Sequence, residues 1–397
     1  MNLDSIKIII NEKLPALKVD DIQGNIVVYP QDSEEISSFI KLCNHKAIQI
    51  IPIGSGSQII GAKQPQVYLS TRKMNRVIEL AKNDLTVSVE GGISIKELAD
   101  ILRQENFLLP ISYHEKPSST IGGLLARDAG GIEQYAYGTI NDYLLGLEFV
   151  TPTGELIKTG GKTVKNVTGY DFTRLFAKSW GTLGVIVRAT FKLIPMPEEK
   201  ALFITEAASV DDLTQAMKEV LSKRFALVSF MGMSAKMLGL TEDSKYASFF
   251  VLAGSKIAVE HQLQVLKSIV DIKGLITGRD NVDAYLEKLF SSKGSVSKIR
   301  FGTDRRSLLD LLPRNLDELL NNNSMEIILD GGNGMVELST SSDFNEAKKM
   351  ITEKLQDFKM CFTDNRAPLD ILYNRMKKEL DPNLIMYPHN PRFMEVS

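Results

Sequence analysis

Residues 117–138 read P-S-S-T-I-G-G-L-L-A-R-D-A-G-G-I-E-Q-Y-A-Y-G. Two glycine pairs alternate with small side chains in this stretch, and few large residues remain to form a core. Glycine lets a backbone approach a flat ligand closely, while serine and threonine hydroxyls add hydrogen bonds without bulk. Ile121, Leu124 and Leu125 are apolar residues that a solvated surface loop does not need. We therefore interpret the stretch as the wall of a cofactor site, and a plain loop is the alternative.

A second glycine-rich turn lies upstream, at residues 54–61, directly after the apolar run 48–53. The run predicts a buried strand, and a glycine-rich turn after a strand points successive backbone N–H groups the same way, which suits a diphosphate. The turn lacks the Lys-Ser/Thr pair of a Walker loop, and Ile59 stands where the Rossmann fingerprint requires a third glycine. A tight turn between two strands is the alternative, with about equal weight.

The composition of the 397 residues is that of an ordinary soluble globular protein, with 43% hydrophobic and 24% charged residues. The length favours two domains, and the formal net charge of -2 gives no electrostatic reason to expect nucleic acid as a partner. Two distant cysteines indicate a reducing compartment. No apolar run is long enough to cross a bilayer, and the N-terminus lacks a signal-peptide pattern. We expect a cytoplasmic protein that docks on a membrane, if at all, through a partner.

Local patterns predict helices and strands along the whole chain. Asp32 with Glu35, and Ser94 with Glu97, are spaced as helix-capping pairs. Strands are predicted at 67–70, 85–89 and 144–150. After Pro195 and Pro197 the pattern changes to alternating elements, which marks a domain boundary. These later elements are strands at 202–205, 226–230, 247–252, 296–301 and 325–329, and helices at 211–221, 259–270, 282–290, 344–355 and 369–380.

Two further blocks make a family resemblance specific. They are K-N-V-T-G-Y-D at residues 165–171 and G-T-L-G-V-I at residues 181–186, and they follow the two glycine blocks in the chain. With these four blocks in order, the chain resembles the PCMH-type FAD-binding fold of the vanillyl-alcohol oxidase superfamily. Within that superfamily it looks like the flavin subunits of glycolate oxidase and D-lactate dehydrogenase, in particular the smaller E subunit of glycolate oxidase.

The resemblance implies an α+β fold with a two-part FAD-binding domain and an α/β cap that contains a mixed or antiparallel sheet. We expect the FAD-binding domain at residues 1–198 and the cap at 199–365. Residues 366–397 would return to the FAD domain, because D-P-N-L-I-M-Y-P-H-N-P-R-F at 381–393 resembles the family's ending.

The resemblance also assigns cofactor-binding residues. In the family the first glycine loop holds the FAD pyrophosphate, the second block lines the ribityl chain and the isoalloxazine, and G-V-I reaches the adenine end. The residues carried over by motif are Pro52, Ile53, Gly54, Ser55, Gly56, Ser57, Gly61, Pro117, Ser118, Ser119, Thr120, Gly122, Gly123, Asp128, Ala129, Gly130, Gly138, Asp142, Gly184, Val185 and Ile186.

Three departures from the family pattern carry consequences. Asp128 replaces a common asparagine, and an acid near a flavin disfavours the anionic reduced form or titrates itself. Trp180 replaces a common glutamate. Ser55, Gly56 and Ser57 offer no histidine or cysteine for covalent attachment, so we expect non-covalent FAD.

The catalytic residues are open. Relatives that are complete 2-hydroxy-acid dehydrogenases carry clustered histidine and acid ligands, whereas the four histidines of this chain are not spaced as a metal pair, so we expect no metal. Arg300 is a candidate carboxylate clamp and His389 a candidate base. Lys165 and Tyr170 either lie near the flavin edge or order their loop.

The resemblance implies an FAD-dependent oxidoreductase that acts on a small 2-hydroxy acid such as glycolate or D-lactate. It also implies two partners, a second flavoprotein subunit and an iron–sulfur subunit that receives the electrons. The alternatives are a non-catalytic FAD-binding assembly subunit and a stand-alone FAD dehydrogenase with another substrate.

Overall fold

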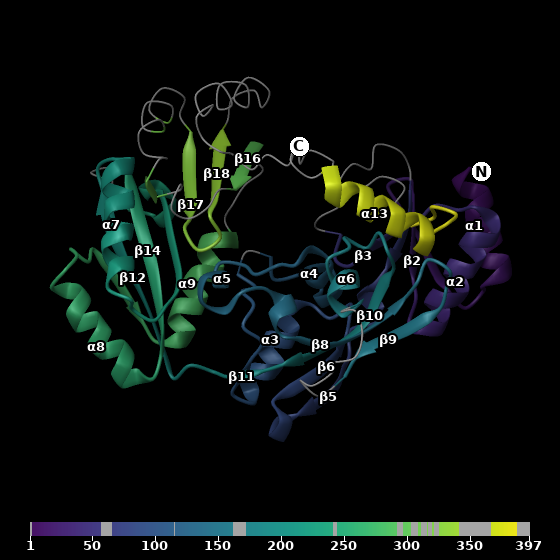
Figure 1. The fold of residues 1–397 in the computed structure, drawn as a ribbon, viewed down its shortest axis with the longest axis horizontal. Coiled ribbons are helices and arrows are strands. Elements are labelled where there is room, and N and C mark those ends of the chain that lie inside the picture. Colours follow the sequence, from purple (N-terminus) through teal and green to yellow (C-terminus); the bar gives the residue numbers. More distant parts are fainter. Residues whose placement is uncertain are drawn as a thin grey trace. The chain divides into compact units, whose positions relative to one another are not determined.

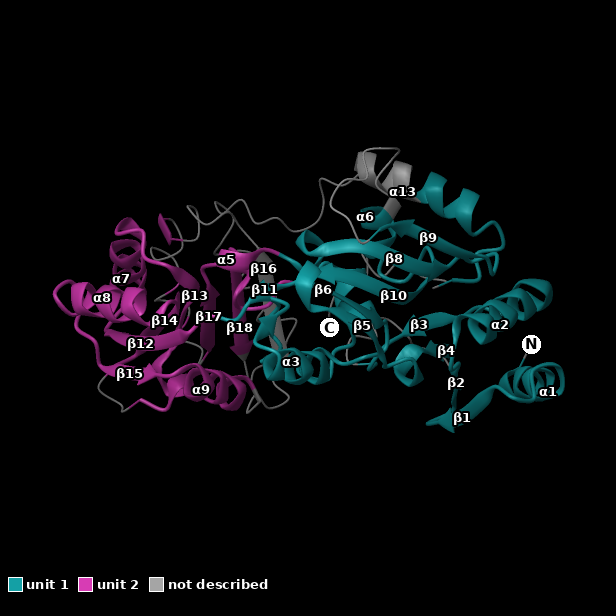
Figure 2. Cartoon of the chain, turned by 90° about the horizontal axis from the view of Figure 1, so that it is seen from below, with its two compact units in different colours: residues 1–129, 139–196, 366–396 teal, residues 130–138, 197–365, 397 magenta. Residues whose placement is uncertain are grey.

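The structure is a computed structural model of the chain. It describes residues 2–56, 66–114, 116–161, 172–240, 244–291, 297–302, 309–310, 316, 320, 325–340 and 367–386. The chain divides into two compact units, which Figure 2 shows in two colours. Unit 1 contains residues 1–129, 139–196 and 366–396, and unit 2 contains residues 130–138, 197–365 and 397.

Unit 1 begins with a small α/β layer (Figure 1). Its sheet has the strand order β1-β2-β4-β3, in which β2, β4 and β3 run parallel and β1 pairs antiparallel with β2. Large aliphatic side chains from the helices and strands form one buried cluster, to which the Cys43 thiol also belongs. The elements are α1 (Leu3–Lys13), β1 (Lys18–Ile22), β2 (Asn25–Tyr29), α2 (Ser33–Lys46), β3 (Ile51–Ile53) and β4 (Val67–Ser70).

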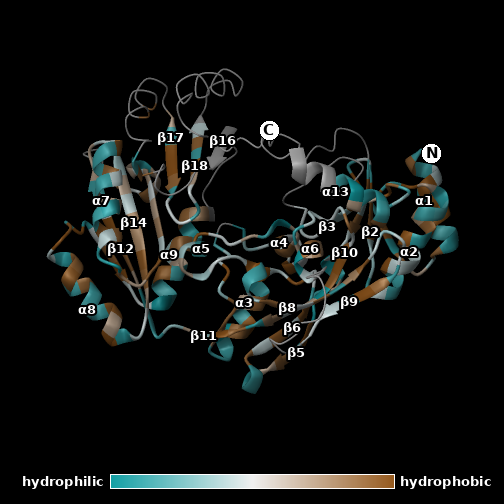
Figure 3. Ribbon diagram, viewed as in Figure 1, coloured by the Kyte–Doolittle hydropathy of each residue, from teal (hydrophilic) through white to brown (hydrophobic). Residues whose placement is uncertain are grey.

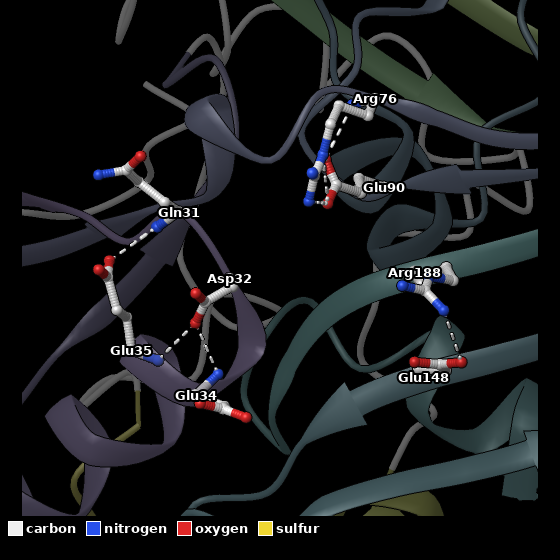
Figure 4. Close-up of polar contacts among 8 residues, drawn as sticks. All are labelled: Gln31, Asp32, Glu34, Glu35, Arg76, Glu90, Glu148 and Arg188. Carbon is white, nitrogen blue, oxygen red and sulfur yellow. Dashed lines mark hydrogen bonds and ion pairs between the residues drawn. The ribbon is translucent and has the colours of Figure 1, made fainter.

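Helix α2 forms where the capping pair predicts it. The Asp32 side chain accepts hydrogen bonds of 2.9 Å from the backbone N–H groups of Glu34 and Glu35. The Glu35 carboxylate in turn accepts a 2.9 Å hydrogen bond from the backbone N–H of Gln31 (Figure 4). These bonds satisfy N–H groups that the first turn of a helix leaves without partners.

The second sheet of unit 1 is antiparallel throughout, with the strand order β5-β6-β10-β8-β9. The helices α4 and α6 pack against its strands, and the rings of Phe149 and Phe176 stack with centroids 3.7 Å apart. The strands are β5 (Val77–Ala81), β6 (Thr86–Glu90), β8 (Leu144–Val150), β9 (Leu156–Gly160) and β10 (Val185–Lys192). The shorter elements are 3-10 turns at Thr71–Lys73, Lys82–Asp84 and Ile140–Asp142, with α3 (Ile95–Gln104), β7 (Phe107–Leu108), α4 (Ile121–Arg127), α6 (Phe172–Ala177) and β11 (Ile194–Pro195).

A row of alternating charges crosses this second sheet. Arg188 stands opposite Glu90 on one neighbouring strand and Glu148 on the other, and Glu148 stands opposite Lys158. Glu90 pairs with Arg76 at 2.7 Å, and Glu148 accepts from Arg188 at 3.3 Å, as Figure 4 shows. Cross-strand pairs of opposite charge support the register of an antiparallel sheet.

Unit 2 is built on a seven-stranded antiparallel sheet with the order β15-β12-β14-β13-β17-β18-β16. Apolar side chains leave both faces of its central strands: Phe203 of β12 joins a cluster with α7 and α8, and Ile204 joins a second cluster with α9. Figure 3 shows the hydrophobic colour along β12 and β17 and both colours on α8. The elements are α5 (Gln134–Tyr137), β12 (Glu199–Ala207), α7 (Val210–Ser222), β13 (Leu227–Ser234), β14 (Tyr246–Gly254), α8 (Lys256–Lys267), β15 (Gly274–Thr277), α9 (Arg279–Ser291), β16 (Ser297–Gly302), β17 (Glu326–Asp330) and β18 (Met335–Thr340), with a 3-10 turn at Ala235–Leu238.

A buried ion triad fixes the segment 130–138 within unit 2. The Lys200 ammonium group lies 2.8 Å from the Glu133 carboxylate and 3.0 Å from that of Asp283, and all three side chains are less than a tenth exposed. Burial lowers the pKa of Lys200, but the two carboxylates outweigh this effect and raise it above its ordinary value. The triad therefore holds a stable positive charge between two acids.

Helix α13 (Ala367–Leu380) brings the end of the described chain back to unit 1. The Ile50 N–H donates to the Ile385 carbonyl oxygen at 2.7 Å, and Ile50 forms a parallel bridge with Met386. The buried Lys377 ammonium group lies 2.6 Å from the Asp381 carboxylate and 2.5 Å from the carbonyl oxygen of Thr182.

Many of the predicted elements are confirmed. Strands 67–70 and 144–150 have the predicted limits, and the predicted helices 211–221, 259–270, 282–290 and 369–380 correspond to α7, α8, α9 and α13. The apolar run 48–53 becomes a strand only at Ile51–Ile53, because Ile50 pairs with the C-terminal segment instead. The sequence did not reveal β15 or β18, and the helix predicted at 344–355 lies outside the described residues. The α+β fold class, with an antiparallel sheet in the second part of the chain, is confirmed.

Candidate functional site

A pocket in unit 1 brings together three segments that are distant in the sequence. They are β3 with the first glycine loop, the beginning and end of α4, and the turn that precedes β10 with the start of that strand, and Thr71 joins them from the turn after β4. The lining residues are Ile51, Pro52, Ile53, Gly54, Ser55, Gly56, Thr71, Ser119, Thr120, Gly122, Gly123, Ala126, Arg127, Trp180, Gly181, Gly184, Val185 and Ile186.

The stretch that we interpreted as a wall contains the short helix α4. Thr120 begins this helix, and its hydroxyl accepts a hydrogen bond of 3.3 Å from the Gly123 N–H. Ile121, Leu124 and Leu125 are buried and recur at helical spacing. The apolar residues therefore attach one side of α4 to the protein, while Gly122, Gly123, Ala126 and Arg127 line the pocket.

Glycine allows the backbone segments of the pocket to lie close together. A Cβ built on Gly54 would overlap the Thr120 side chain, and one built on Gly122 would stand 3.0 Å from the carbonyl oxygen of Gly91. The Gly122 N–H donates to that oxygen at 2.7 Å. Side chains at these positions would thus separate the glycine loop and α4 from their neighbours.

Ser119 offers the pocket a buried polar group. The residue is 2% exposed, and its hydroxyl has no hydrogen-bond partner among the described residues. A buried hydroxyl without a partner is costly, so such a group in a pocket wall indicates a polar ligand. An oxygen-rich ligand would satisfy it.

Arg127 supplies the charge of the pocket. Among the described lining residues it alone has an ionisable side chain. Its Nε atom donates a hydrogen bond of 3.3 Å to the Gly123 carbonyl oxygen, one turn earlier in α4. The pocket therefore combines uncharged residues, most of them small, with one guanidinium group, which suits an anion.

The structure gathers about half of the sequence-predicted cofactor residues at this pocket. Those that line it are Pro52, Ile53, Gly54, Ser55, Gly56, Ser119, Thr120, Gly122, Gly123, Gly184, Val185 and Ile186. Pro117, Ser118, Asp128, Ala129 and Asp142 belong to unit 1 without lining it, and Gly130 and Gly138 belong to unit 2. Ser57, Gly61 and His389 lie outside the described residues, as do Lys165 and Tyr170, while Arg300 lies on strand β16 of unit 2.

The Asp128 carboxylate has three hydrogen-bond partners among the described residues, none of which lines the pocket. Its carboxylate accepts hydrogen bonds from Thr139 at 2.6 Å, Asn141 at 2.7 Å and Lys178 at 2.5 Å. Burial raises the pKa of Asp128, but the hydrogen bonds from Lys178, Thr139 and Asn141 outweigh burial and lower it below its ordinary value. Asp128 therefore stays ionised and fastens the end of α4 to the following turn.

Asp142 and His114 also have local partners. The Asp142 carboxylate accepts a 2.8 Å hydrogen bond from the Thr139 N–H, as in a helix cap. His114 is buried, lies 2.9 Å from the Ser112 hydroxyl through Nδ1, and stacks on Tyr113. These contacts order the chain on either side of α4.

Sequence reasoning missed several pocket residues. Thr71 lines the pocket but carries no distinctive pattern of its own, while Ala126, Arg127 and Gly181 lie within the quoted stretches 117–138 and 181–186 without being assigned to the cofactor. Trp180 could have been found, because it stands out as a departure from the family pattern. It also adopts a left-handed backbone conformation, with φ of 56°.

Metal sites and membrane-spanning helices are the two other features that bear on function in the described part of the chain. No group of three or more histidine, cysteine, aspartate or glutamate residues there is arranged to hold a metal ion. Among the described helices, none is both long enough and apolar enough to cross a membrane.

Comparison with known proteins gives the pocket a context. Residues 25–160 match the family model of the FAD binding domain. The chain is 29% identical over 255 residues to glycolate oxidase subunit GlcD of Bacillus subtilis (strain 168), an alignment that covers 61% of this chain and 54% of that protein. It is 33% identical over 233 residues to a D-lactate dehydrogenase of Archaeoglobus fulgidus, covering 58% of this chain and 52% of that protein. The chain thus spans about half the length of the curated relatives it matches.

Solved structures share the fold at low sequence identity. Alkyldihydroxyacetonephosphate synthase superposes with a TM-score of 0.72 at 20% identity, over 92% of this chain and 77% of that one. A 4-ethylphenol oxidase from Gulosibacter chungangensis superposes with a TM-score of 0.70 at 15% identity, over 98% of this chain and 93% of that one. The predicted PCMH-type FAD-binding fold is confirmed by these neighbours together with the family match. Residues 25–160, which include the two glycine blocks, are thus similar to the FAD binding domain family, and the solved structures share the fold of nearly the whole chain.

Proposed function

We propose that this chain binds FAD non-covalently in the unit 1 pocket and uses it to oxidise a small 2-hydroxy acid. The observation that carries the proposal is the meeting of the glycine loop, α4 and the Gly184 turn around a buried Ser119 hydroxyl and one arginine. The relatives named as a glycolate oxidase subunit and D-lactate dehydrogenases support the substrate class.

The pocket residues fit the chemistry of FAD. Backbone N–H groups of Gly54, Ser55 and Gly56 and the Arg127 guanidinium group would bind the diphosphate, because amides and a guanidinium together neutralise phosphate oxygens. Ser119 and Thr120 would donate to ribityl or phosphate oxygens. The close approach of Gly54 to the Thr120 side chain and of Gly122 to the Gly91 backbone leaves room for the cofactor beside them.

The lining residues support non-covalent binding. None of the described residues around the pocket is a histidine or a cysteine, the two residue types that attach flavins covalently in relatives. FAD held in this way would dissociate from the unfolded chain.

We propose a separate role for each part of the chain. Residues 1–198 together with 366–397 form the FAD-binding domain, and residues 199–365 form the cap that holds the substrate. When bound, FAD supplies the two-electron acceptor for oxidation of the carbon that bears the hydroxyl group. In the cap, Arg300 would bind the substrate carboxylate, and His389 of the returning segment would accept the hydroxyl proton.

We further propose that the chain works in the cytoplasm as one subunit of a complex, with a second flavoprotein subunit and an iron–sulfur subunit as electron acceptor. The name of the Bacillus relative, a subunit of glycolate oxidase, supports this arrangement. The competing possibilities are a non-catalytic FAD-binding assembly subunit and a stand-alone FAD dehydrogenase for another substrate.

A dye-reduction assay tests the activity. The purified chain, reconstituted with FAD, is given glycolate, D-lactate, L-lactate or D-2-hydroxyglutarate and an artificial electron acceptor. We expect turnover with at least one D-2-hydroxy acid or glycolate, and Arg300→Met should raise KM at least tenfold. Full FAD occupancy without turnover on any of the four acids would favour the assembly subunit.

A further inference from the structure

Trp180 adopts a backbone conformation that is unusual for a bulky side chain. Its φ is 56°, in the left-handed region, and the next residue, Gly181, has φ of 73°. Glycine tolerates this region, whereas a large residue at positive φ is strained and calls for a reason. The strain is local to the pocket, because both residues line it.

The backbone of this turn is held without help from the indole ring. The Trp180 N–H donates to the Ala126 carbonyl oxygen at 3.0 Å, and the Thr182 N–H donates to the Ser179 carbonyl oxygen at 3.0 Å. The Thr182 carbonyl oxygen in turn accepts from the buried Lys377 ammonium group. A glycine at position 180 would keep all of these bonds and relieve the strain.

The ring itself must therefore account for the tryptophan. Trp180 is half-buried and lines the pocket, where Arg127 is the one ionisable residue among the described lining residues. A flat indole beside glycines is a surface against which another flat ring can stack. FAD has two such rings, adenine and isoalloxazine.

We propose that the Trp180 indole is a positioning residue that stacks on an aromatic ring of bound FAD and that the strained backbone is retained for this contact. The inference rests on the proposed FAD site. Stacking of one ring on tryptophan typically changes affinity by about tenfold.

Two variants and one matched control test the proposal. Trp180→Gly removes the ring and relieves the strain, while Trp180→Phe keeps a flat ring at the same φ. Leu85→Gly is the control, because Leu85 also has a positive φ of 51° but does not line the pocket. Calorimetry measures the Kd of FAD, FMN and ADP for each protein, and thermal unfolding without ligand measures the relief of strain.

The expected result separates binding from stability. Trp180→Gly should have a melting temperature no lower than that of the wild-type chain, yet bind FAD about tenfold more weakly. Trp180→Phe should bind FAD with a Kd within about threefold of the wild-type value. Leu85→Gly should bind FAD with the wild-type affinity. If Trp180→Gly loses affinity for ADP but not for FMN, the indole contacts the adenine ring. If it loses affinity for FMN but not for ADP, the indole contacts the isoalloxazine ring. Because Trp180 is the one tryptophan of the chain, FAD should also protect its emission from quenching by acrylamide.

Two results would overturn the inference in different ways. If wild type and Trp180→Gly bind FAD equally and acrylamide quenching is unchanged, Trp180 does not stack on the cofactor, and the FAD site itself stands. If neither the wild-type chain nor any variant binds FAD, the proposed function fails and the inference fails with it. The acrylamide quenching of the wild-type chain with and without FAD decides the matter even if Trp180→Gly does not fold.

Discussion

Gly54 lies directly against the side chain of Thr120, so that a Cβ on Gly54 would overlap the threonine hydroxyl oxygen and stand 3.0 Å from its Cβ. The contact joins the first glycine loop to the residue that begins α4. Because both residues line the pocket, its shape depends on the absence of a side chain at position 54.

Gly54→Ala should therefore open the pocket wall. We expect the affinity for FAD to fall at least tenfold and the free energy of unfolding to fall by about 1–3 kcal/mol, the usual cost of forcing a methyl group into a packed site. Calorimetric titration with FAD and urea unfolding measure the two effects. Gly254→Ala is the control, because a Cβ there meets nothing within 4 Å. Wild-type FAD affinity in Gly54→Ala would show that the loop does not hold the cofactor.

Arg127 should make the binding of FAD sensitive to salt. Arg127→Met removes the one charge among the described lining residues. Because a charge-assisted hydrogen bond is lost, we expect the affinity for FAD to fall by about tenfold or more at low ionic strength. The difference in FAD affinity between Arg127→Met and the wild-type chain should become smaller at higher salt concentration, because salt screens the attraction between the guanidinium group and FAD. Arg224→Met, an exposed change in unit 2, should bind FAD as wild type. Equal salt dependence in Arg127→Met and wild type would contradict a contact with the diphosphate.

Asp128 should add stability that disappears in acid. Its pKa is lower in the folded chain than the ordinary value of 3.8, so its contribution is present above about pH 4 and is lost as the pH falls through the folded pKa. Asp128→Asn should cost about 1 kcal/mol at pH 7 and progressively less below pH 4. Urea unfolding at a series of pH values measures this difference. Asp84→Asn, at an exposed position, is the control. If the difference in the free energy of unfolding between Asp128→Asn and the wild-type chain is constant across the pH range, the Asp128 carboxylate does not contribute the stability that is lost in acid.

Lys377 should hold the C-terminal helix to unit 1. Lys377→Met leaves the Asp381 side chain, 1% exposed, buried without its cation, and breaking a buried ion pair in this way typically costs about 3–5 kcal/mol. Because the single tryptophan lies in unit 1, its emission during urea unfolding reports on that unit. Lys378→Met changes the exposed neighbour and should have little effect. Similar unfolding curves for both variants would mean that the buried pair does not stabilise unit 1.

Local sequence patterns predicted much of the fold because the signals themselves are local. Ser94 and Glu97 form the expected capping box of α3, and residues 67–70 form the expected strand β4. Long-range pairing was not readable in the same way. Ile50 belongs to an apolar run that looks like a strand, but its backbone pairs with Ile385, far away in the chain.

The candidate site was predictable where glycine is required and obscure elsewhere. Gly54, Gly122 and Gly184 were predicted because a side chain at each of these positions would meet neighbouring atoms, so that glycine is required there and forms part of a recognisable motif. Arg127 was missed because its position at the pocket depends on the tertiary contacts of α4. The sequence led us to expect Asp128 near the flavin. No sequence pattern predicted the side chains that donate hydrogen bonds to it, which are those of Thr139, Asn141 and Lys178.

The most direct test of the account is the absorption spectrum of the purified chain, recorded without oxygen before and after the addition of glycolate and then D-lactate. We predict a bound-flavin spectrum that bleaches with at least one of the two acids. A chain that binds no FAD under any condition of reconstitution would contradict the account at its centre. A flavin that is bound but stays oxidised with both acids would contradict the proposed activity of the isolated chain.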